Sequence, residues 1–171
     1  MNLDCRRLPP IQQTVSFLSP FLMQEHIRKG LCDSMQTPQG SYLFFNGLMS
    51  GVFRAYGIFL IDGENIGFHG FTFGYLENGV FVDHLCLNRN APALDCLKLA
   101  IRTMTGEYAR EGAEVKAIEG NIPDRNRAAR WIAKKLGFKD LGIREDKKFY
   151  KGDYIYPCRQ FLLERNELWA K

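Results

Sequence analysis

The stretch "GNIPDRNRAARWIAKKLGF", from Gly120 to Phe138, decides the fold because it joins the end of a strand to a complete helix signal. The strand is predicted over Glu114 to Asn121, which is short and strand-like. Asp124 is expected to cap the helix, and Gly137 is expected to end it with Phe138 folding back. Three apolar side chains share one face of this helix: Ala129, Ile132 and Leu136.

A longer helix is predicted before this strand, because apolar residues recur there at spacings of three and four. Asn90 and Pro92 mark its start and Gly112 its end. Its core-facing stripe is Leu94, Leu97, Ile101, Met104 and Tyr108. The helix connects the apolar segment "VFVDHLCL" (80–87) to Glu114–Asn121. These two strands are therefore predicted to lie parallel in a right-handed βαβ unit.

The rest of the chain is predicted to be mostly antiparallel. "SYLFF", "VFRAYGIFLI" and "NIGFHGFTFGYL" precede residues 80–87, with tight turns at Asp62-Gly63 and Asn78-Gly79. "KDLGIRED" and "YIYPCRQFLLER" follow the last helix, with Pro157 marking an edge position or a bulge. Ser19-Pro20 predicts a helix from Pro20 to Lys29.

The expected fold class is therefore α+β (α/β). We expect a mixed, mostly antiparallel central sheet, one βαβ unit and helices on both faces. The chain has 171 residues, of which 46% are hydrophobic and 25% charged, so it is expected to form a single domain over residues 1–171. Residues 1–40 are expected to be less regular than the rest.

Composition narrows the possible classes of protein. The apolar patch near the N-terminus is short and interrupted by Pro20, so neither a secretory signal nor a membrane span is expected and the predicted location is cytoplasmic. Five cysteines without CxxC spacing favour free thiols over disulfides or a zinc site. The net charge of +4 suits an anionic ligand, whereas scattered basic residues without a recognition signature make a nucleic-acid partner a distant third possibility.

A parallel pair inserted in an antiparallel sheet is expected to splay where its strands part. The freed backbone groups can bind an extended ligand, and the N-terminus of the next helix can bind an anion. An extended amide chain that ends in a pyrophosphate, such as the pantetheine arm of coenzyme A, has both properties.

Over roughly Val52 to Arg165 the sequence resembles the GNAT superfamily of N-acetyltransferases, and in particular the divergent GNAT-fold proteins of tailed bacteriophages. In the family's second cofactor motif, an Asn is followed three residues later by Ala, often by Tyr four residues after that, and then by Gly-Phe. The matching positions are Asn126, Ala129, Ala133, Gly137 and Phe138. The resemblance implies a GNAT-like fold, acetyl-CoA or another acyl-CoA as co-substrate, no metal, and a primary amine on a small molecule or protein as acceptor.

The resemblance also implies cofactor contacts at two places in the chain. One is the end of the strand before the long helix, at Leu85, Cys86, Leu87 and Asn88, and the other is the short helix, at Asn126, Ala129, Arg130 and Lys134. Asn126 would hydrogen-bond the cofactor, and Arg127, Arg130 or Lys134 would reach its phosphates. In the other interpretation, Asn126 only starts the helix and the basic residues are a solvated face.

The resemblance makes Asp83 the predicted general base, because it lies four residues before Leu87, where members of the family can supply a base directly or through water. His84 is the second catalytic candidate, since its ordinary pKa suits proton transfer better, but it should face the other side of the strand. Both also fit ordinary structural roles, as a solvent-facing strand residue and a half-buried histidine, and His69 is similarly ambiguous. Tyr150, Tyr154 and Tyr156 are candidates for the general acid, but their spacing selects none of them.

Two parts of the sequence depart from the family pattern. Pro92, Asp95 and Leu97 stand where the family's first cofactor motif has Gln or Arg and two small residues, and Ala133 replaces a tyrosine that often protonates the departing thiolate. Glycines at this loop normally let the backbone approach the pyrophosphate closely. Three outcomes stay open: a reshaped loop that still presents helix N–H groups, a different acyl carrier, or a non-catalytic GNAT-fold protein with a protein-binding or structural role.

Overall fold

The structure is a computed structural model. It describes the backbone of residues 2–30, 46–51, 53–60, 62–73 and 79–164. Side chains are described for residues 2–27, 46–51, 54–60, 62–67 and 87–164. The predicted strand "SYLFF" and the turn at Asn78 therefore lie outside the described residues.

One seven-stranded sheet in the order β1-β2-β3-β4-β5-β7-β6 forms the centre of the molecule. Among the described strands, β4 and β5 run parallel and every other neighbouring pair runs antiparallel. The mixed sheet with one βαβ unit is thus as predicted. The strands are β1 Leu3–Arg7, β2 Phe53–Leu60, β3 Asn65–Phe73, β4 Gly79–Leu87, β5 Ala117–Pro123, β6 Lys139–Lys151 and β7 Tyr154–Glu164.

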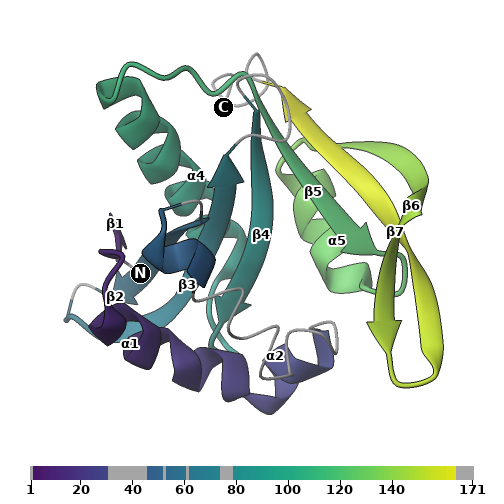
Figure 1. Cartoon of the computed structure of the whole chain (residues 1–171), viewed down its shortest axis with the longest axis horizontal. Coiled ribbons are helices and arrows are strands. Elements are labelled where there is room, and N and C mark those ends of the chain that lie inside the picture. The colour runs from purple at the N-terminus through teal and green to yellow at the C-terminus, as the bar shows by residue number, and fades with distance from the viewer. Residues whose placement is uncertain (1, 31–45, 52, 61, 74–78, 165–171) are drawn as a thin grey trace.

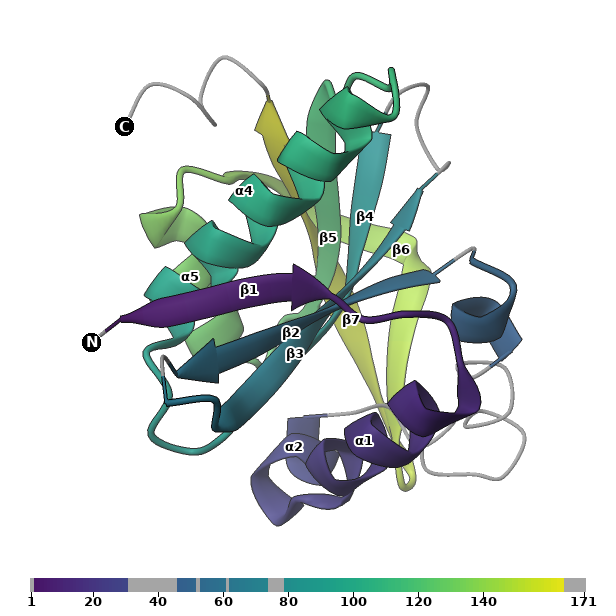
Figure 2. The ribbon, with the colours of Figure 1, turned by 90° about the vertical axis from the view of Figure 1, so that its left-hand side faces the viewer.

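Helices cover both faces of this sheet (Figures 1 and 2). They are α1 Gln12–Met23, α2 Glu25–Gly30, α4 Ala93–Arg110 and α5 Arg127–Lys135. Successive side chains of β2 point to opposite faces of the sheet and so enter two different cores. Tyr56 and Ile58 belong to a cluster with α4 and α5, whereas Ala55 belongs to a cluster with α1. None of the helices within the described ranges has the length and hydrophobicity needed to cross a membrane.

The stripe predicted for α4 is buried at Leu97, Ile101, Met104 and Tyr108. Burying each side chain of this size stabilises the fold by about 1.5 to 3 kcal/mol, which fixes α4 against the sheet. Leu94, the fifth residue of the predicted stripe, lies at the edge of this packing and lines a cavity instead.

The helix predicted from Pro20 to Lys29 is wrong in its start, because α1 begins at Gln12 and contains Pro20. Ser19 does not cap a helix; its Oγ donates to the carbonyl of Val15 inside α1 at 2.8 Å. The carbonyl that Pro20 leaves without a helical partner belongs to Ser16, which is exposed and can be hydrated. The segment from Glu25 to Gly30 forms a separate helix, α2.

Smaller differences concern caps and strand limits. Asn126, and not Asp124, is the N-cap of α5, while Gly137 ends the helix with a φ of 92° and Phe138 folds back into the core as predicted. β5 begins three residues later than Glu114 and reaches Pro123. Pro157 faces a register shift in β6, which is the predicted bulge, but β7 lies inside the sheet rather than at its edge.

Candidate functional site

The two parallel strands diverge shortly after they meet. β4 and β5 share three residue pairs, Gly79–Ala117, Val80–Ile118 and Phe81–Glu119, and then part. β4 continues beside β3 as far as Leu87, and β5 continues beside β7 as far as Pro123. Figure 1 shows the two strands close together at one end and far apart at the other. The predicted splay is therefore present.

The ladder between β3 and β4 determines which backbone groups of β4 face the splay. The Asn88 N–H donates to the Ile66 carbonyl opposite it at 2.7 Å, so this is a hydrogen-bonded antiparallel pair. Because such pairs alternate along the ladder, Cys86 and Asn88 direct their N–H and C=O groups to β3. Leu85 and Leu87 direct theirs to the side where β5 has departed.

The α1–α2 junction binds the end of β4. His26 Nε2 donates to the Leu87 carbonyl oxygen at 2.8 Å, and Gln24 Nε2 donates to Asn88 Oδ1 at 2.9 Å. The Leu87 carbonyl is thus occupied from within the chain. The N–H of Leu87 and the N–H and C=O of Leu85 are the groups left facing the splay, which gives an extended amide ligand two donors and one acceptor.

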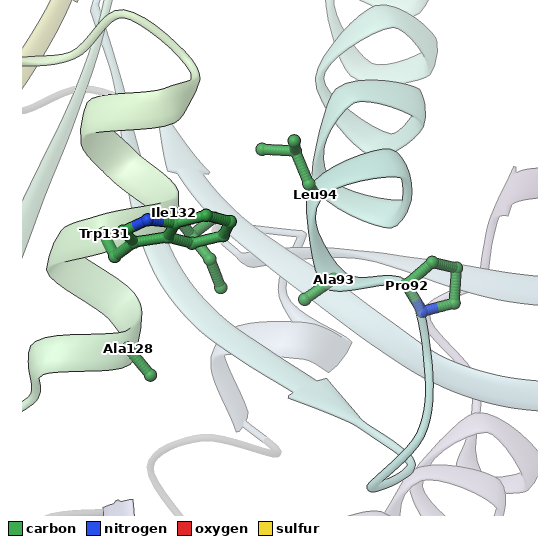
Figure 3. Close-up of a pocket in the computed structure, with 6 residues that line it drawn as sticks. All are labelled: Pro92, Ala93, Leu94, Ala128, Trp131 and Ile132. Carbon is green, nitrogen blue, oxygen red and sulfur yellow. The ribbon is translucent and has the colours of Figure 1, made fainter.

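An apolar cavity of about 370 Å³ lies between the starts of α4 and α5 (Figure 3). Trp131 reaches from α5 toward α4 and is 55% exposed, and Leu94 projects from the first turn of α4 toward it. The remaining lining residues are Pro92, Ala93, Ala128 and Ile132. The cavity is on the α4–α5 face of the sheet and can take the apolar parts of an elongated ligand.

The structure gives three of the predicted cofactor residues internal partners. Asn126 Oδ1 accepts from the Ala129 N–H at 3.1 Å, so the asparagine caps α5. Arg130 Nη1 lies 3.1 Å from Asp124 Oδ1, and Lys134 Nζ lies 3.7 Å from Asp140 Oδ2. The interpretation of Asn126 as a helix cap is therefore correct, and the two cations already contact carboxylates.

Asp124 and Asp140 also contact Arg159, which lies on β7 and connects them. Arg159 Nε donates to Asp124 Oδ1 at 2.6 Å, and Arg159 Nη1 donates to Asp140 Oδ1 at 3.1 Å. Burial alone would raise the pKa of Asp140, but the Gly142 N–H and Arg159 together hold it below its ordinary value. This network fixes the start of α5 to the sheet.

Two other cations lie close in the chain to residues that line the cavity, and neither has a partner among the described residues. Arg89 is exposed in the loop from β4 to α4, and Arg127 is exposed as the first residue of α5. Each is close in the chain to a helix N-terminus that can attract an anion. Asp95 is also exposed and lies in the first turn of α4, where its charge opposes a bound phosphate.

The predicted catalytic side chains lie outside the described side chains, so only their backbone positions are known. His84 pairs with Gly70 and Val82 pairs with Phe71, which leaves Asp83 as the extra residue of a bulge in β4. The bulge lies just beyond the last residue shared with β5. Bulges are frequent beside active sites because they redirect a strand.

The candidate tyrosines lie together on the β6–β7 hairpin. Tyr154 and Tyr156 stack with ring centroids 6.1 Å apart, and the Arg125 guanidinium lies 4.4 Å from the ring centroid of Tyr156. Tyr150 is 51% exposed. Ala133, at the family's tyrosine position, is buried in the core and carries no proton donor.

Sequence reasoning missed several residues of the site. The sequence analysis predicts no role for Trp131 and places Leu94 in the core-facing stripe, although a tryptophan on a short basic helix is a signal for binding. His26 was also missed, because its contact with Leu87 joins segments that are distant in the chain. Arg89 was missed because no motif marks the loop in which it lies.

Comparison with known proteins gives a consistent result at the level of structure. No protein-family model and no curated protein matches the sequence. An acetyltransferase from Salmonella typhimurium that modifies the N-terminal serine of ribosomal protein L7/L12 has 16% identity and a TM-score of 0.72, covering 96% of this chain and 95% of that one. Spermidine N-acetyltransferase from Vibrio cholerae, in complex with CoA and spermine, has 12% identity and a TM-score of 0.71, covering 97% of both chains. The chain thus has the GNAT fold.

Proposed function

We propose that this protein is an acyl-CoA-dependent N-acyltransferase of the cytoplasm, which transfers an acetyl group from acetyl-CoA to a primary amine. The observation that carries the proposal is the divergence of β4 and β5 beside an apolar cavity, with the amides of Leu85 and Leu87 facing the splay. The similarity to acetyltransferases that act on a ribosomal protein and on polyamines supports the same class of reaction.

In this proposal the C=O of Leu85 and the N–H of Leu87 pair with the amides of the pantetheine arm. The Leu85 N–H, which is nearer to Asp83 and the reacting end, donates to the oxygen that becomes negative during acyl transfer. The N-terminus of α4, with Arg89 and Arg127 nearby, attracts the phosphates. When bound, acetyl-CoA supplies the activated acyl group.

Asp83 takes the proton of the acceptor amine in the proposed reaction, directly or through water, and His84 is the alternative base. The support for Asp83 is the bulge that places it at the point where the strands part. Cys86 and Asn88 contribute indirectly, since their backbone groups hold β4 against β3.

Filling the cavity tests the proposal. Ala128 is exposed on α5 and lines the cavity, so Ala128→Phe should block an elongated ligand without disturbing the core. A ligand at one hundred times its dissociation constant adds about 2.7 kcal/mol of stability, which for a domain of this size raises the melting temperature by about 5 to 11 °C. We expect acetyl-CoA to produce this shift in the wild type and a much smaller one in Ala128→Phe.

Ala109→Phe is the matched control, because Ala109 is exposed at the other end of α4 and lies outside the cavity. It should keep the full acetyl-CoA shift. If acetyl-CoA shifts no variant, or shifts Ala128→Phe as much as Ala109→Phe, the cavity does not bind the cofactor.

A second candidate function is a non-catalytic GNAT-fold protein with a protein-binding or structural role, such as a bacteriophage component. It is favoured by Asp95 in the first turn of α4, by the buried Ala133, and by the internal ion pairs of Arg130 and Lys134. Acetyl-CoA turnover with a panel of primary amines separates the two candidates. Turnover that is lost in Asp83→Asn would exclude the non-catalytic role, whereas stoichiometric cofactor binding without turnover would support it.

A further inference from the structure

The face of β5 opposite α4 and α5 carries two acidic or amide side chains next to the splay. Ile118 and Ile122 pack into the core shared with α4 and α5. Because side chains alternate along a strand, Glu119 and Asn121 project to the other face. Glu119 is opposite Phe81 in the last pair that β5 makes with β4, so it stands where the splay begins.

Glu119 is buried to an unusual degree for a glutamate, with 7% of its surface exposed. Its neighbour among the described cations is Arg144, whose Nη1 lies 3.7 Å from Glu119 Oε1, beyond hydrogen-bond distance. A buried carboxylate normally accepts several hydrogen bonds, since water cannot reach it. Within the part of the chain that the structure describes, no group donates a hydrogen bond to the Glu119 carboxylate, so its oxygens have unused acceptor capacity.

Arg144 is itself committed to another acid. Its Nε and Nη2 donate to the two carboxylate oxygens of Asp146 at 2.7 and 2.6 Å, a bidentate pair that lowers the pKa of Asp146 to about 2. Glu119, Arg144 and Asp146 together carry one surplus negative charge. The surplus is on the buried side, at Glu119, because the exposed side of the guanidinium is neutralised by Asp146.

Asn121 adds a second unused acceptor two residues along the same face. Its Oδ1 is buried and has no hydrogen-bond partner among the described residues. An unpaired buried acceptor destabilises the fold unless a donor reaches it. Glu119 and Asn121 thus place two acceptors and a surplus negative charge two residues apart on one face of β5, which is the complement of a group with several N–H donors and a positive charge.

The position of these residues fits an acceptor and not the cofactor. The cavity between α4 and α5 lies on the other face of the sheet, where Ile118 and Ile122 point. A molecule that meets the thioester in the splay must therefore approach from the face of Glu119 and Asn121.

We propose that Glu119 and Asn121 form a subsite that binds the ammonium group of a primary aliphatic amine, the acceptor of the acyl group. The inference rests on the proposed function for the identity of this amine as acceptor. Such a subsite would select alkylamines, which are protonated at physiological pH, over aromatic amines, which are neutral.

Calorimetric titration with cadaverine tests the subsite directly, on the full chain and both with and without coenzyme A. We expect cadaverine to bind the wild type and its neutral diol analogue not to bind. Glu119→Gln keeps the shape of the side chain and removes its charge, so it should weaken cadaverine binding about tenfold or more. Asn121→Ala is a second variant and should weaken it by a smaller factor, about threefold to tenfold.

Glu164→Gln is the matched control, because Glu164 is an exposed glutamate on β7 that pairs with Lys139 at 2.9 Å, away from the splay. It should bind cadaverine as the wild type does. Wild-type affinity in both Glu119→Gln and Asn121→Ala, equal binding of the diol, or no cadaverine binding by the wild type would each overturn the subsite. A missing acetyl-CoA shift in the wild type would count against the proposed function alone, because the amine titration does not need the cofactor.

Discussion

Asn126 carries two assigned roles, and substitutions at this position separate them. Its Oδ1 caps α5 through the Ala129 N–H at 3.1 Å, and its Nδ2 is the group left to donate to a cofactor. Asn126→Ala removes both groups. Loss of an N-cap costs about 1 kcal/mol of unfolding free energy, in a range of about 0.5 to 2 kcal/mol. For a domain of this size, a loss of about 1 kcal/mol should lower the melting temperature by about 2 to 4 °C.

Asn126→Asp is the informative partner of this substitution. Aspartate caps helices about as well as asparagine and its charge suits a helix N-terminus, so the unfolding free energy should stay close to that of the wild type. The variant has no N–H donor, and loss of one neutral hydrogen bond of about 0.5 to 1.5 kcal/mol should weaken acetyl-CoA binding about twofold to twelvefold. The added negative charge should weaken it further.

The assay is urea unfolding of the free protein together with calorimetric titration of acetyl-CoA. The expected pattern is that Asn126→Ala loses both stability and affinity, whereas Asn126→Asp loses affinity alone. Unchanged unfolding free energy in Asn126→Ala would refute the cap. Wild-type affinity in Asn126→Asp would refute the cofactor contact and leave Asn126 as a helix-starting residue.

Two further predictions concern the groups that hold the site in place. Folding lowers the pKa of Asp140. Its contribution to the unfolding free energy is therefore complete above the pKa of the unfolded chain, about 3.9, and is lost as the pH falls through the lower pKa of the folded protein. Asp140→Asn should therefore lower the unfolding free energy, measured by urea unfolding, by about 1 to 2 kcal/mol at pH 7. In acid the difference from the wild type should shrink to zero. A constant difference at every pH would contradict the pairing of Asp140 with Arg159. Burial raises the pKa of the Cys96 thiol to about 11, helped by the nearby charge of Asp95. Iodoacetamide at pH 8 should leave Cys96 unmodified in the native protein and modify it after denaturation, as read by mass spectrometry, and rapid native labelling would contradict its burial.

The parts of the fold that could be predicted from sequence are those set by local signals. The periodic stripe of α4 and the Gly137 stop of α5 are such signals, because periodicity and a glycine with positive φ act within one helix. The N-terminal helix was misplaced because its local signal at Ser19-Pro20 is overridden by packing. Val15 and Phe21 are buried on both sides of Pro20, so the helix continues through it.

β1 and much of the site could not be predicted because they depend on distant partners. Leu3 in β1 pairs with Leu60, more than fifty residues away, and its strand has too few apolar residues to stand out. His26 reaches Leu87 from a helix whose start was itself misplaced. The splay was predictable because it follows from the order of elements, whereas the side chains that surround it follow from packing.

The two ends of the candidate cofactor site differ in how well their backbone groups suit coenzyme A. At the thioester end, the amides of Leu85 and Leu87 face the splay. At the phosphate end, Pro92 takes the N-cap position with a φ of −74°, and no glycine lies in 88–95 to bring the backbone close to a pyrophosphate.

Asp95 deepens this difference, because a carboxylate in the first turn already interacts with the positive end of the α4 dipole. The N-terminus that would attract a phosphate is partly compensated from within the chain. Recognition should then depend mainly on the pantetheine arm and the acyl group, with a smaller contribution from the nucleotide than a glycine-rich loop would give. We therefore expect an acyl group on a phosphopantetheine arm without the nucleotide to lose little binding energy at such a site, so acyl carriers other than coenzyme A are candidate donors for this chain.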